Sequence, residues 1–277
     1  MCLPGTVETV HERVEREGLP RLDRRAALLG AAGAALAAAL PVTARAAPGG
    51  ASSVQDLTHV FAEGFPTFGP PSPEREPFAT YAANGFYSQK WTFHEHSGTH
   101  MDAPGHFIPG KRLTPDIPAS DLIAPLAVID IRRKAARNPD AMVEVSDIRR
   151  YERTHGAIPS GALVAMDSGW AAKVDDPLAF KGGEAFPNYH FPGFSNDAAM
   201  FLAEERNVRA IGVDTISLDP GNSSTFDVHV NFLGTNRYGV ENLANLGSVP
   251  PAGATIYVGV IPWEEGSGGP LRAFAAW

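Results

Sequence analysis

Four short apolar runs constrain the fold of this chain most strongly. Each is too short for a typical helix, predominantly apolar and rich in β-branched residues, which indicates a buried strand. The runs cover residues 126–131, 162–167, 208–213 and 254–261. Two helical segments lie between them, residues 147–154 after the N-cap Ser146 and residues 196–205 after the N-cap Ser195. Strands separated by helices predict one α/β domain with a mixed or parallel central sheet.

The N-terminus predicts an export signal. Arg24 and Arg25 precede an alanine-rich apolar run to Val42, and a small-residue site follows at residues 44–46. This layout is typical of a twin-arginine signal peptide over residues 1–47, with a permanent membrane span as the weaker alternative. We therefore expect a linker at residues 48–55, a folded domain at residues 56–277, and an exported bacterial protein, periplasmic or extracellular.

Composition excludes several classes of function. The only cysteine is Cys2, inside the predicted signal, so the mature chain has no thiol for a disulfide, a nucleophile or a metal ligand. The whole chain carries a formal net charge of −8, and removing the signal leaves it acidic. An acidic protein is a poor partner for nucleic acid.

A dense group of metal-binding side chains occupies residues 96–106. His96, His100, Asp102 and His106 recur in a stretch whose glycines and proline rule out a continuous helix. All four positions are even-numbered, so in an extended chain their side chains would point to one face, with Gly98 leaving space between them. Imidazole nitrogens and carboxylate oxygens hold Zn²⁺ or Mn²⁺ in proteins. The stretch predicts the first half of a metal site, the alternative being a histidine-rich surface loop.

Further ligands have to come from elsewhere, because a first-row metal usually takes four to six donors. His229 lies in a segment of alternating polarity, residues 226–232. Glu241 follows near the expected start of a helix, where backbone N–H groups favour a deprotonated carboxylate. On spacing alone, a solvated glutamate at a helix start is the commoner case. Asp167 and Asp214 also follow apolar runs, where they serve either a site or a turn.

The pattern His96-x3-His100-x-Asp102-x3-His106 resembles the signature of the putative cyclase family, which includes bacterial kynurenine formamidases and isatin hydrolases. The resemblance runs from about Asp56 to Trp263. It also rests on residues 56–59, 191–195, 212–219 and the spacing from His229 to Glu241. It implies a swivelling β/α fold of the cyclase type, with a mixed central sheet or barrel-like core flanked by helices.

The resemblance also implies roles for individual residues. His96, His100 and Asp102 would bind a first Zn²⁺ or Mn²⁺, and Asp102, His229 and Glu241 a second, with the two carboxylates bridging. His106 would be the general acid and base, or alternatively a further metal ligand. Phe68 would contact the substrate, at a position where formamidases carry a tryptophan, so the usual formamidase substrate is in doubt.

The implied activity is hydrolysis of an N-formyl or cyclic amide bond in a small aromatic substrate, resembling an arylformamidase. Two cations would lower the pKa of a bridging water from about 15.7 toward about 7, providing hydroxide as the nucleophile. The aromatic residues upstream of the histidines either line an apolar pocket or belong to the core: Phe65, Phe68, Phe86, Tyr87 and Trp91.

Two other functions stay open. One is a lactone hydrolase or a cyclase on the same metal centre, and the other is an exported metal-binding protein without turnover. The expected partners are a small-molecule substrate and the twin-arginine export machinery. Family members commonly form homodimers or homotetramers, so the resemblance implies one of these assemblies.

Overall fold

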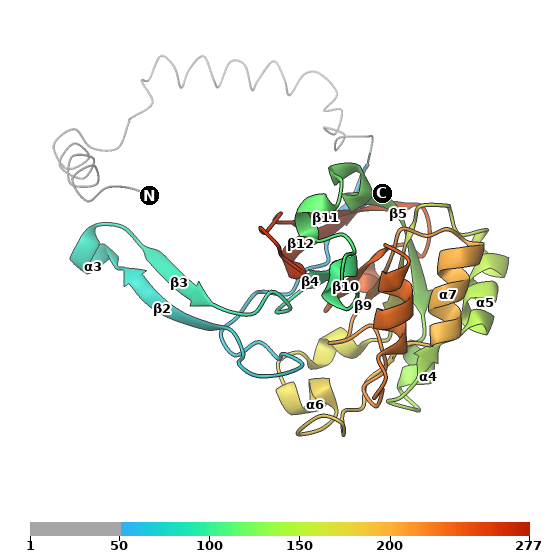
Figure 1. Ribbon diagram of the computed structural model, residues 1–277, viewed down its shortest axis with the longest axis horizontal. Coiled ribbons are helices and arrows are strands. Elements are labelled where there is room, and N and C mark those ends of the chain that lie inside the picture. The colour runs from blue at the N-terminus through green and yellow to red at the C-terminus, as the bar shows by residue number, and fades with distance from the viewer. Residues whose placement is uncertain (1–50) are drawn as a thin grey trace, which may run out of the picture. The chain divides into compact units, whose positions relative to one another are not determined.

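Seven strands close into a barrel-like sheet in the computed structural model, which describes residues 51–277 (Figure 1). The order is β12-β11-β5-β7-β9-β10-β4, and β4 pairs back onto β12. The four strands from β5 to β10 are parallel, and β4, β12 and β11 close the ring by antiparallel pairing. Their bounds are β4 His100–Asp102, β5 Ile123–Asp130, β7 Leu163–Asp167, β9 Ala210–Val213, β10 Tyr238–Glu241, β11 Ala254–Val260 and β12 Gly268–Ala276. The predicted fold class is thereby confirmed.

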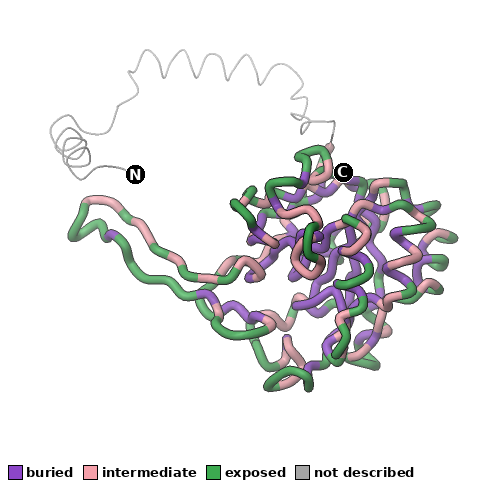
Figure 2. Tube along the Cα trace, viewed as in Figure 1, coloured by how far each residue is buried: buried purple, intermediate pink, exposed green. Residues whose placement is uncertain are grey.

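The parallel strands are mostly apolar because both of their faces are covered over most of their length. In β7, Leu163 and Ala165 pack in one core cluster with Met101 and Val240, while Val164 and Met166 pack in another with residues of the helices. Successive side chains of a strand point to opposite faces, so an uninterrupted apolar run is needed to fill both layers. Strands β7, β9 and β10 are accordingly buried at every position, and β5 is buried from Leu126 to Ile129 (Figure 2).

Helices and one small sheet complete the body of the protein. The helices α5 and α7 lie side by side against the sheet (Figure 1), and Ser195 caps α7 as predicted, accepting a hydrogen bond from the Ala198 N–H. Helix α5 begins at Val145, so Ser146 is not its cap; the Asp147 carboxylate instead accepts a hydrogen bond from the Glu144 N–H at 2.9 Å. The remaining bounds are α4 Arg132–Ala135, α5 Val145–His155, α6 Pro177–Lys181 and α7 Asn196–Glu205, with β6 Met142–Val143 paired to β8 Gly193–Phe194.

Among the described residues, 75–92 are separate from the compact unit made of residues 51–74 and 93–277. This part of the chain is a hairpin of β2 (Glu74–Ala79) and β3 (Ser88–Thr92), joined through the short helix α3 (Tyr81–Asn84). An ion pair between Glu76 and Lys90 crosses the two strands. Tyr87 is 53% exposed.

The chain enters the fold at β1 (Val54–Asp56), which pairs with β12. This strand begins two residues before the predicted domain start at residue 56, so the last part of the predicted linker is strand. The predicted signal peptide, residues 1–47, lies outside the described residues. Among the helices of residues 51–277, none has the length and apolar character needed to cross a membrane.

Candidate metal centre

Two neighbouring strands carry the centre of the site. His100 and Asp102 are both on β4, with Met101 between them, and Glu241 ends β10 directly opposite His100 in the antiparallel register. Met101 points into the core, so the alternation of a strand turns His100 and Asp102 to the opposite face. The His100 Nε2 lies 3.3 Å from Asp102 Oδ1 and 3.4 Å from Glu241 Oε2.

His229 approaches the two carboxylates from another segment. Its Nε2 lies 3.3 Å from Asp102 Oδ2 and 3.3 Å from Glu241 Oε1. The other ring nitrogen, Nδ1, is 2.6 Å from the Asp219 carboxylate, which also accepts hydrogen bonds from the backbone N–H groups of Val228 and His229. Asp219 therefore holds both the ring and the backbone of His229 in place.

The backbone around His229 and Glu241 differs from the sequence-based expectation. His229 begins a short π-helical segment, His229–Leu233, although residues 226–232 alternate in polarity. Glu241 is the last residue of β10, not the first of a helix. Its carboxylate accepts a hydrogen bond from the Leu218 N–H at 2.9 Å, so a single backbone donor replaces the expected helix terminus.

His96 and His106 complete the histidine cluster. The His96 Nδ1 lies 2.7 Å from Asp102 Oδ1, and the rings of His96 and His106 are stacked with centroids 3.7 Å apart. Only His100 and Asp102 lie in a strand, because Gly98 adopts a left-handed φ of 68° and His106 closes the 3₁₀ turn Pro104–His106. The side chains converge through these bends, not through one extended face.

Burial and charge make this centre attract positive charge. His100, Asp102, His229 and Glu241 are each at most 5% exposed. Burial lowers the pKa of His100, but the hydrogen bond and charge of Asp102, with the charge of Glu241, outweigh it and raise that pKa to about 9. Burial and the nearby charge of Asp102 raise the pKa of the Glu241 carboxyl.

The donor set fits a divalent cation. His100 Nε2 and Asp102 Oδ2 are buried and have no hydrogen-bond partner among the described residues, although each lies close to groups of opposite charge. Buried polar atoms are rarely left without partners unless an ion or water serves them. The ligating atoms of two sets of three residues lie within 4.8 Å of one another: His100, Asp102 and Glu241, and His96, Asp102 and His106.

His106 has a different environment from the other histidines. Neither of its ring nitrogens forms a hydrogen bond with the described part of the chain, whereas His96, His100 and His229 each do. Burial, partly opposed by the charge of Asp102, lowers the pKa of His106 to about 4. The ring is therefore neutral near pH 7 and has a lone pair available to accept a proton.

An apolar cavity of about 380 Å³ opens onto these residues. Its walls include Phe68, Phe107, Phe226 and Ile216. His94, a solvent-exposed residue, also lines it. The Phe226 ring centroid lies 5.7 Å from those of both Phe68 and Phe107, so three aromatic rings adjoin the cluster of histidines and carboxylates. This volume lies in the range of small-molecule sites.

The upstream aromatic residues do not all share this cavity. Phe68 is in its lining, but Phe65 is buried in the body at 4% exposure. Phe86, Tyr87 and Trp91 belong to the hairpin of residues 75–92, which is separate from that compact unit. A position upstream of the histidines in the sequence therefore does not by itself place an aromatic side chain in the cavity.

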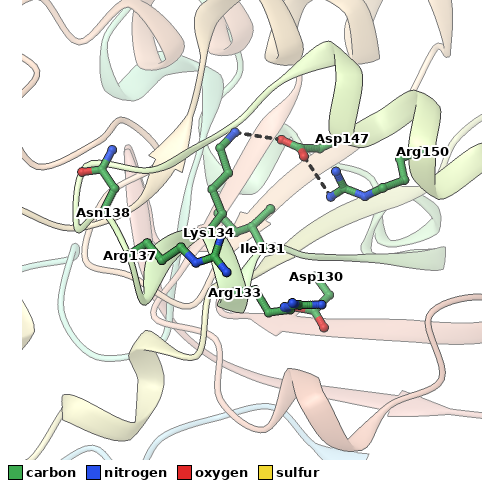
Figure 3. A pocket seen from close by; sticks show the side chains of 8 residues that line it. All are labelled: Asp130, Ile131, Arg133, Lys134, Arg137, Asn138, Asp147 and Arg150. Carbon is green, nitrogen blue, oxygen red and sulfur yellow. Dashed lines mark hydrogen bonds and ion pairs between the residues drawn. The ribbon is translucent and has the colours of Figure 1, made fainter.

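A larger cavity, of about 620 Å³, lacks comparable chemistry (Figure 3). None of its lining residues is a histidine, and its buried carboxylate is already paired. Asp147 lies 3.2 Å from the Lys134 Nζ and 2.8 Å from the nearest Arg150 guanidinium nitrogen. The smaller cavity at the histidines is therefore the functional candidate.

Asp214 stabilises the turn after β7. Its buried carboxylate accepts hydrogen bonds from the backbone N–H groups of Ser168 and Trp170 and from the Ser168 hydroxyl. Asp167 likewise accepts one from the Gly169 N–H. Both carboxylates hold the turn after β7, the more conservative of the two sequence-based interpretations. Asp219, in contrast, was missed as a site residue, although it lies ten positions before His229.

Comparison with known proteins identifies relatives of this chain. Residues 55–220 match the family model described as putative cyclase. Isatin hydrolase from Roseibium aggregatum is 34% identical over 216 residues, which cover 74% of this chain and 81% of that protein. Kynurenine formamidase from Sphingopyxis alaskensis is 29% identical over 159 residues, which cover 56% of this chain and 64% of that protein.

The fold agrees as well. The solved structure of isatin hydrolase A from Ralstonia solanacearum has a TM-score of 0.77 at 33% identity, covering 93% of this chain and 98% of that chain. The resemblance found from the sequence pattern is confirmed both by the family match and by this likeness of structure. The chain belongs to the putative cyclase family.

Proposed function

We propose that the protein is a metal-dependent hydrolase that cleaves a cyclic or N-formyl amide bond in a small aromatic substrate. One observation carries this proposal: a group of buried histidines and carboxylates with unpartnered ligand atoms adjoins a cavity walled by aromatic rings. The names of the related proteins, isatin hydrolase and kynurenine formamidase, support the same chemistry.

The ligands of the metal are, in this proposal, His96, His100, Asp102, His229 and Glu241. Asp102 and Glu241 each lie between two histidines, an arrangement that suits carboxylates shared by two cations. Zn²⁺ and Mn²⁺ are both compatible with these nitrogen and oxygen donors. A divalent cation bound here would lower the pKa of a water molecule and polarise the carbonyl group of the substrate.

His106 acts as the general base and then as the general acid. Its lowered pKa keeps the imidazole neutral, so it can accept the proton of the attacking water and pass it to the leaving nitrogen. Its ring nitrogens are not engaged by other described residues, which leaves them available to the substrate. Stacking on His96 fixes the plane of the His106 ring beside Asp102.

The aromatic walls bind and orient the substrate. Phe68, Phe107 and Phe226 provide flat apolar surfaces against which an aromatic ring stacks. A cyclic amide fused to an aromatic ring fits this setting, because its carbonyl and its ring lie in one plane. The phenylalanine at position 68, where formamidases carry a tryptophan, also favours the cyclic amide over N-formylkynurenine.

The test is a substrate panel on the metal-loaded enzyme. Mature protein is loaded with Zn²⁺ or Mn²⁺ and assayed with isatin, N-formylkynurenine and simple aromatic lactones. We expect isatin to be opened to the amino acid product and N-formylkynurenine to be a poorer substrate. Absence of turnover across the whole panel, with metal retained, would favour a metal-binding protein without catalysis. Faster turnover of the lactones would instead assign the lactone hydrolase activity.

We also propose that the protein is exported through the twin-arginine pathway and works as a homodimer or homotetramer. The basis for export is Arg24-Arg25 with the apolar run and small-residue site that follow it. Cell fractionation of the native chain and of an Arg24→Lys/Arg25→Lys variant tests this, because the variant should stay in the cytoplasm. Light scattering of the purified protein measures the assembly.

A further inference from the structure

A chain of hydrogen bonds extends from the outer side of His96. The His96 Nε2 lies 3.0 Å from the Ser267 Oγ, and that hydroxyl lies 2.7 Å from the Glu95 Oε2. The same carboxylate oxygen accepts a second hydrogen bond from the Ser267 N–H, at 2.9 Å. Ser267 is therefore held by Glu95 through both its backbone and its side chain, and its hydroxyl faces the imidazole.

The direction of these hydrogen bonds determines the tautomer of His96. An ionised carboxylate only accepts hydrogen bonds, so the single hydroxyl proton of Ser267 points to Glu95. The Ser267 Oγ then offers a lone pair to His96, and the Nε2 has to carry the proton. The lone pair of the neutral ring is consequently on Nδ1, the nitrogen that lies 2.7 Å from Asp102.

The fold delivers Ser267 to this position. Ser267 precedes β12, and its carbonyl accepts a hydrogen bond from the Ala103 N–H at 2.9 Å, one residue after β4. Gly268, the next residue, pairs with Asp102 and packs against the His96 ring so closely that an added Cβ would lie 2.5 Å from its Cε1. The start of β12 is thus shaped around the His96 imidazole.

His100 and His229 also each have one ring nitrogen held by an outer partner, although the partner groups differ from that of His96. The His100 Nδ1 is 2.9 Å from the Gly98 carbonyl, and the His229 Nδ1 is 2.6 Å from the Asp219 carboxylate. In each histidine, one nitrogen is held by an outer partner and the other faces the carboxylates of the centre. Such outer partners set the tautomer and orientation of metal-binding histidines.

We propose that Ser267 and Glu95 are positioning residues that hold His96 as the Nε2–H tautomer, with Nδ1 directed to the metal. This inference rests on the proposed function, because it takes His96 to be a metal ligand. Neither residue lies in the pattern that identified the histidines, and Ser267 lies beyond residues 55–220, the part that matches the family model.

Calorimetric titration of the metal-free mature protein with Zn²⁺ tests the proposal. Ser267→Ala and Glu95→Gln should each weaken Zn²⁺ binding about 10- to 100-fold, the usual effect of removing an outer partner of a ligand. Ser267→Thr keeps the hydroxyl and should bind within about threefold of the wild type. Ser248→Ala, which changes an exposed serine elsewhere in the same unit, is the matched control and should bind as the wild type does.

A second readout separates positioning from general damage to the fold. In a long-range ¹H–¹⁵N spectrum of the zinc-loaded wild type, His96 should show a proton on Nε2 that exchanges slowly. In Ser267→Ala, that proton should exchange rapidly while the signals of His100 and His229 persist. Circular dichroism and the thermal midpoint of each variant identify any that fail to fold, and Ser267→Thr then provides the comparison.

The outcomes distinguish this inference from the proposed function. If wild-type protein binds no Zn²⁺ or Mn²⁺, the proposed metal-dependent function fails. If the wild type binds metal, and folded Ser267→Ala and Glu95→Gln bind it within twofold of the wild type, the positioning role is wrong. A proton on Nδ1 of His96 in the zinc-loaded protein would also overturn it.

Discussion

Glu241, the last residue of β10, lies directly opposite His100 on β4, and their side chains approach to 3.4 Å. The antiparallel pairing of two short strands thus joins a carboxylate and an imidazole that are far apart in the sequence. Glu241 also lies 3.3 Å from His229, which approaches from a separate segment, His229–Leu233. A change at Glu241 should therefore affect two histidines together.

Glu241→Gln should weaken metal binding without unfolding the protein. The glutamine Oε1 can still accept the hydrogen bond from the Leu218 N–H, but the negative charge between His100 and His229 is lost. We expect Zn²⁺ affinity to fall at least about 100-fold, measured by calorimetry, with a thermal midpoint in the absence of metal equal to or above that of the wild type. Unchanged affinity would remove Glu241 from the ligand set.

His106→Ala should separate catalysis from metal binding. The His106 ring forms no hydrogen bond with the described residues, so its loss leaves the ligands of the centre in place. We expect kcat to fall about 10²- to 10⁴-fold, the usual contribution of a general base. Zn²⁺ affinity, measured on the same preparation, should stay within about threefold of the wild type. A loss of affinity as large as the loss of rate would identify His106 as a ligand.

The pH dependence of the reaction should reflect the lowered pKa of His106. A base has to be unprotonated to accept a proton, so kcat/KM falls as the pH drops through its pKa. An ordinary histidine has a pKa of about 6.5 and would be mostly protonated at pH 5.5. With a pKa of about 4, His106 stays neutral at pH 5.5, and the acidic decline should lie below that pH.

A pH profile of kcat/KM between pH 4 and 8, with the metal content checked at each pH, measures this decline. Loss of metal at low pH would imitate it, and the metal analysis identifies that case. A decline centred at pH 6 to 7 with metal fully retained would show that burial does not lower the pKa of His106 in the working enzyme.

Phe226 should determine the preference for aromatic substrates, and its strained backbone conformation should lower the free energy of unfolding. It adopts a left-handed backbone with φ of 52°, unusual for a bulky residue, and its ring lines the cavity. Phe226→Gly and Phe226→Ala remove the same ring but differ in the Cβ. Both should raise KM for isatin to a similar extent, because the stacking surface is lost.

The stability of the two Phe226 variants should differ. Only alanine keeps the strain of a side chain in the left-handed region, which costs about 1 to 2 kcal/mol. Phe226→Gly should therefore have the higher free energy of unfolding. The greater flexibility of glycine in the unfolded chain reduces this difference. Chemical denaturation of the metal-free proteins measures the difference. An unchanged KM in both variants would place the aromatic substrate elsewhere in the cavity.

Bound metal should stabilise the fold measurably. A cation that binds only the folded chain adds about 2.7 kcal/mol at a concentration 100 times its dissociation constant. Chelation should therefore lower the thermal midpoint, and added Zn²⁺ or Mn²⁺ should restore it. The Glu241→Gln variant is the matched control, because chelation should shift its midpoint far less. Equal shifts in the two proteins would mean that the stabilising cation binds outside this centre.

Much of the fold could be predicted from local patterns. The four apolar runs were predicted as buried strands, and they form β5, β7, β9 and β11. Strands β7 and β9 are buried at every position, as continuous apolar sequence predicts, whereas burial alternates along β11. Local sequence patterns were a poor guide where hydrogen bonds from other segments determine the backbone conformation. The segment at His229 alternates in polarity, yet it forms a π-helical turn, because Asp219 binds its backbone N–H groups.

Part of the centre was also predictable. The spacing of His96, His100 and Asp102 indicated a metal half-site, and the family resemblance extended it to His229 and Glu241. Glu95 and Ser267 carried no comparable signal, since a lone serine or glutamate next to a strand is common in any chain. Their relation to His96 exists only after β12 pairs with β4.

The sequence by itself determined two properties of this protein: which segments form the long strands of the sheet, and which side chains between residues 96 and 106 are of the types that hold a divalent cation. These properties follow from residue type and local periodicity. The tertiary structure alone decided which nitrogen of each histidine faces the carboxylates and which aromatic rings adjoin them. Those relations depend on strand register and on hydrogen bonds between distant segments, which come into existence only when the sheet closes.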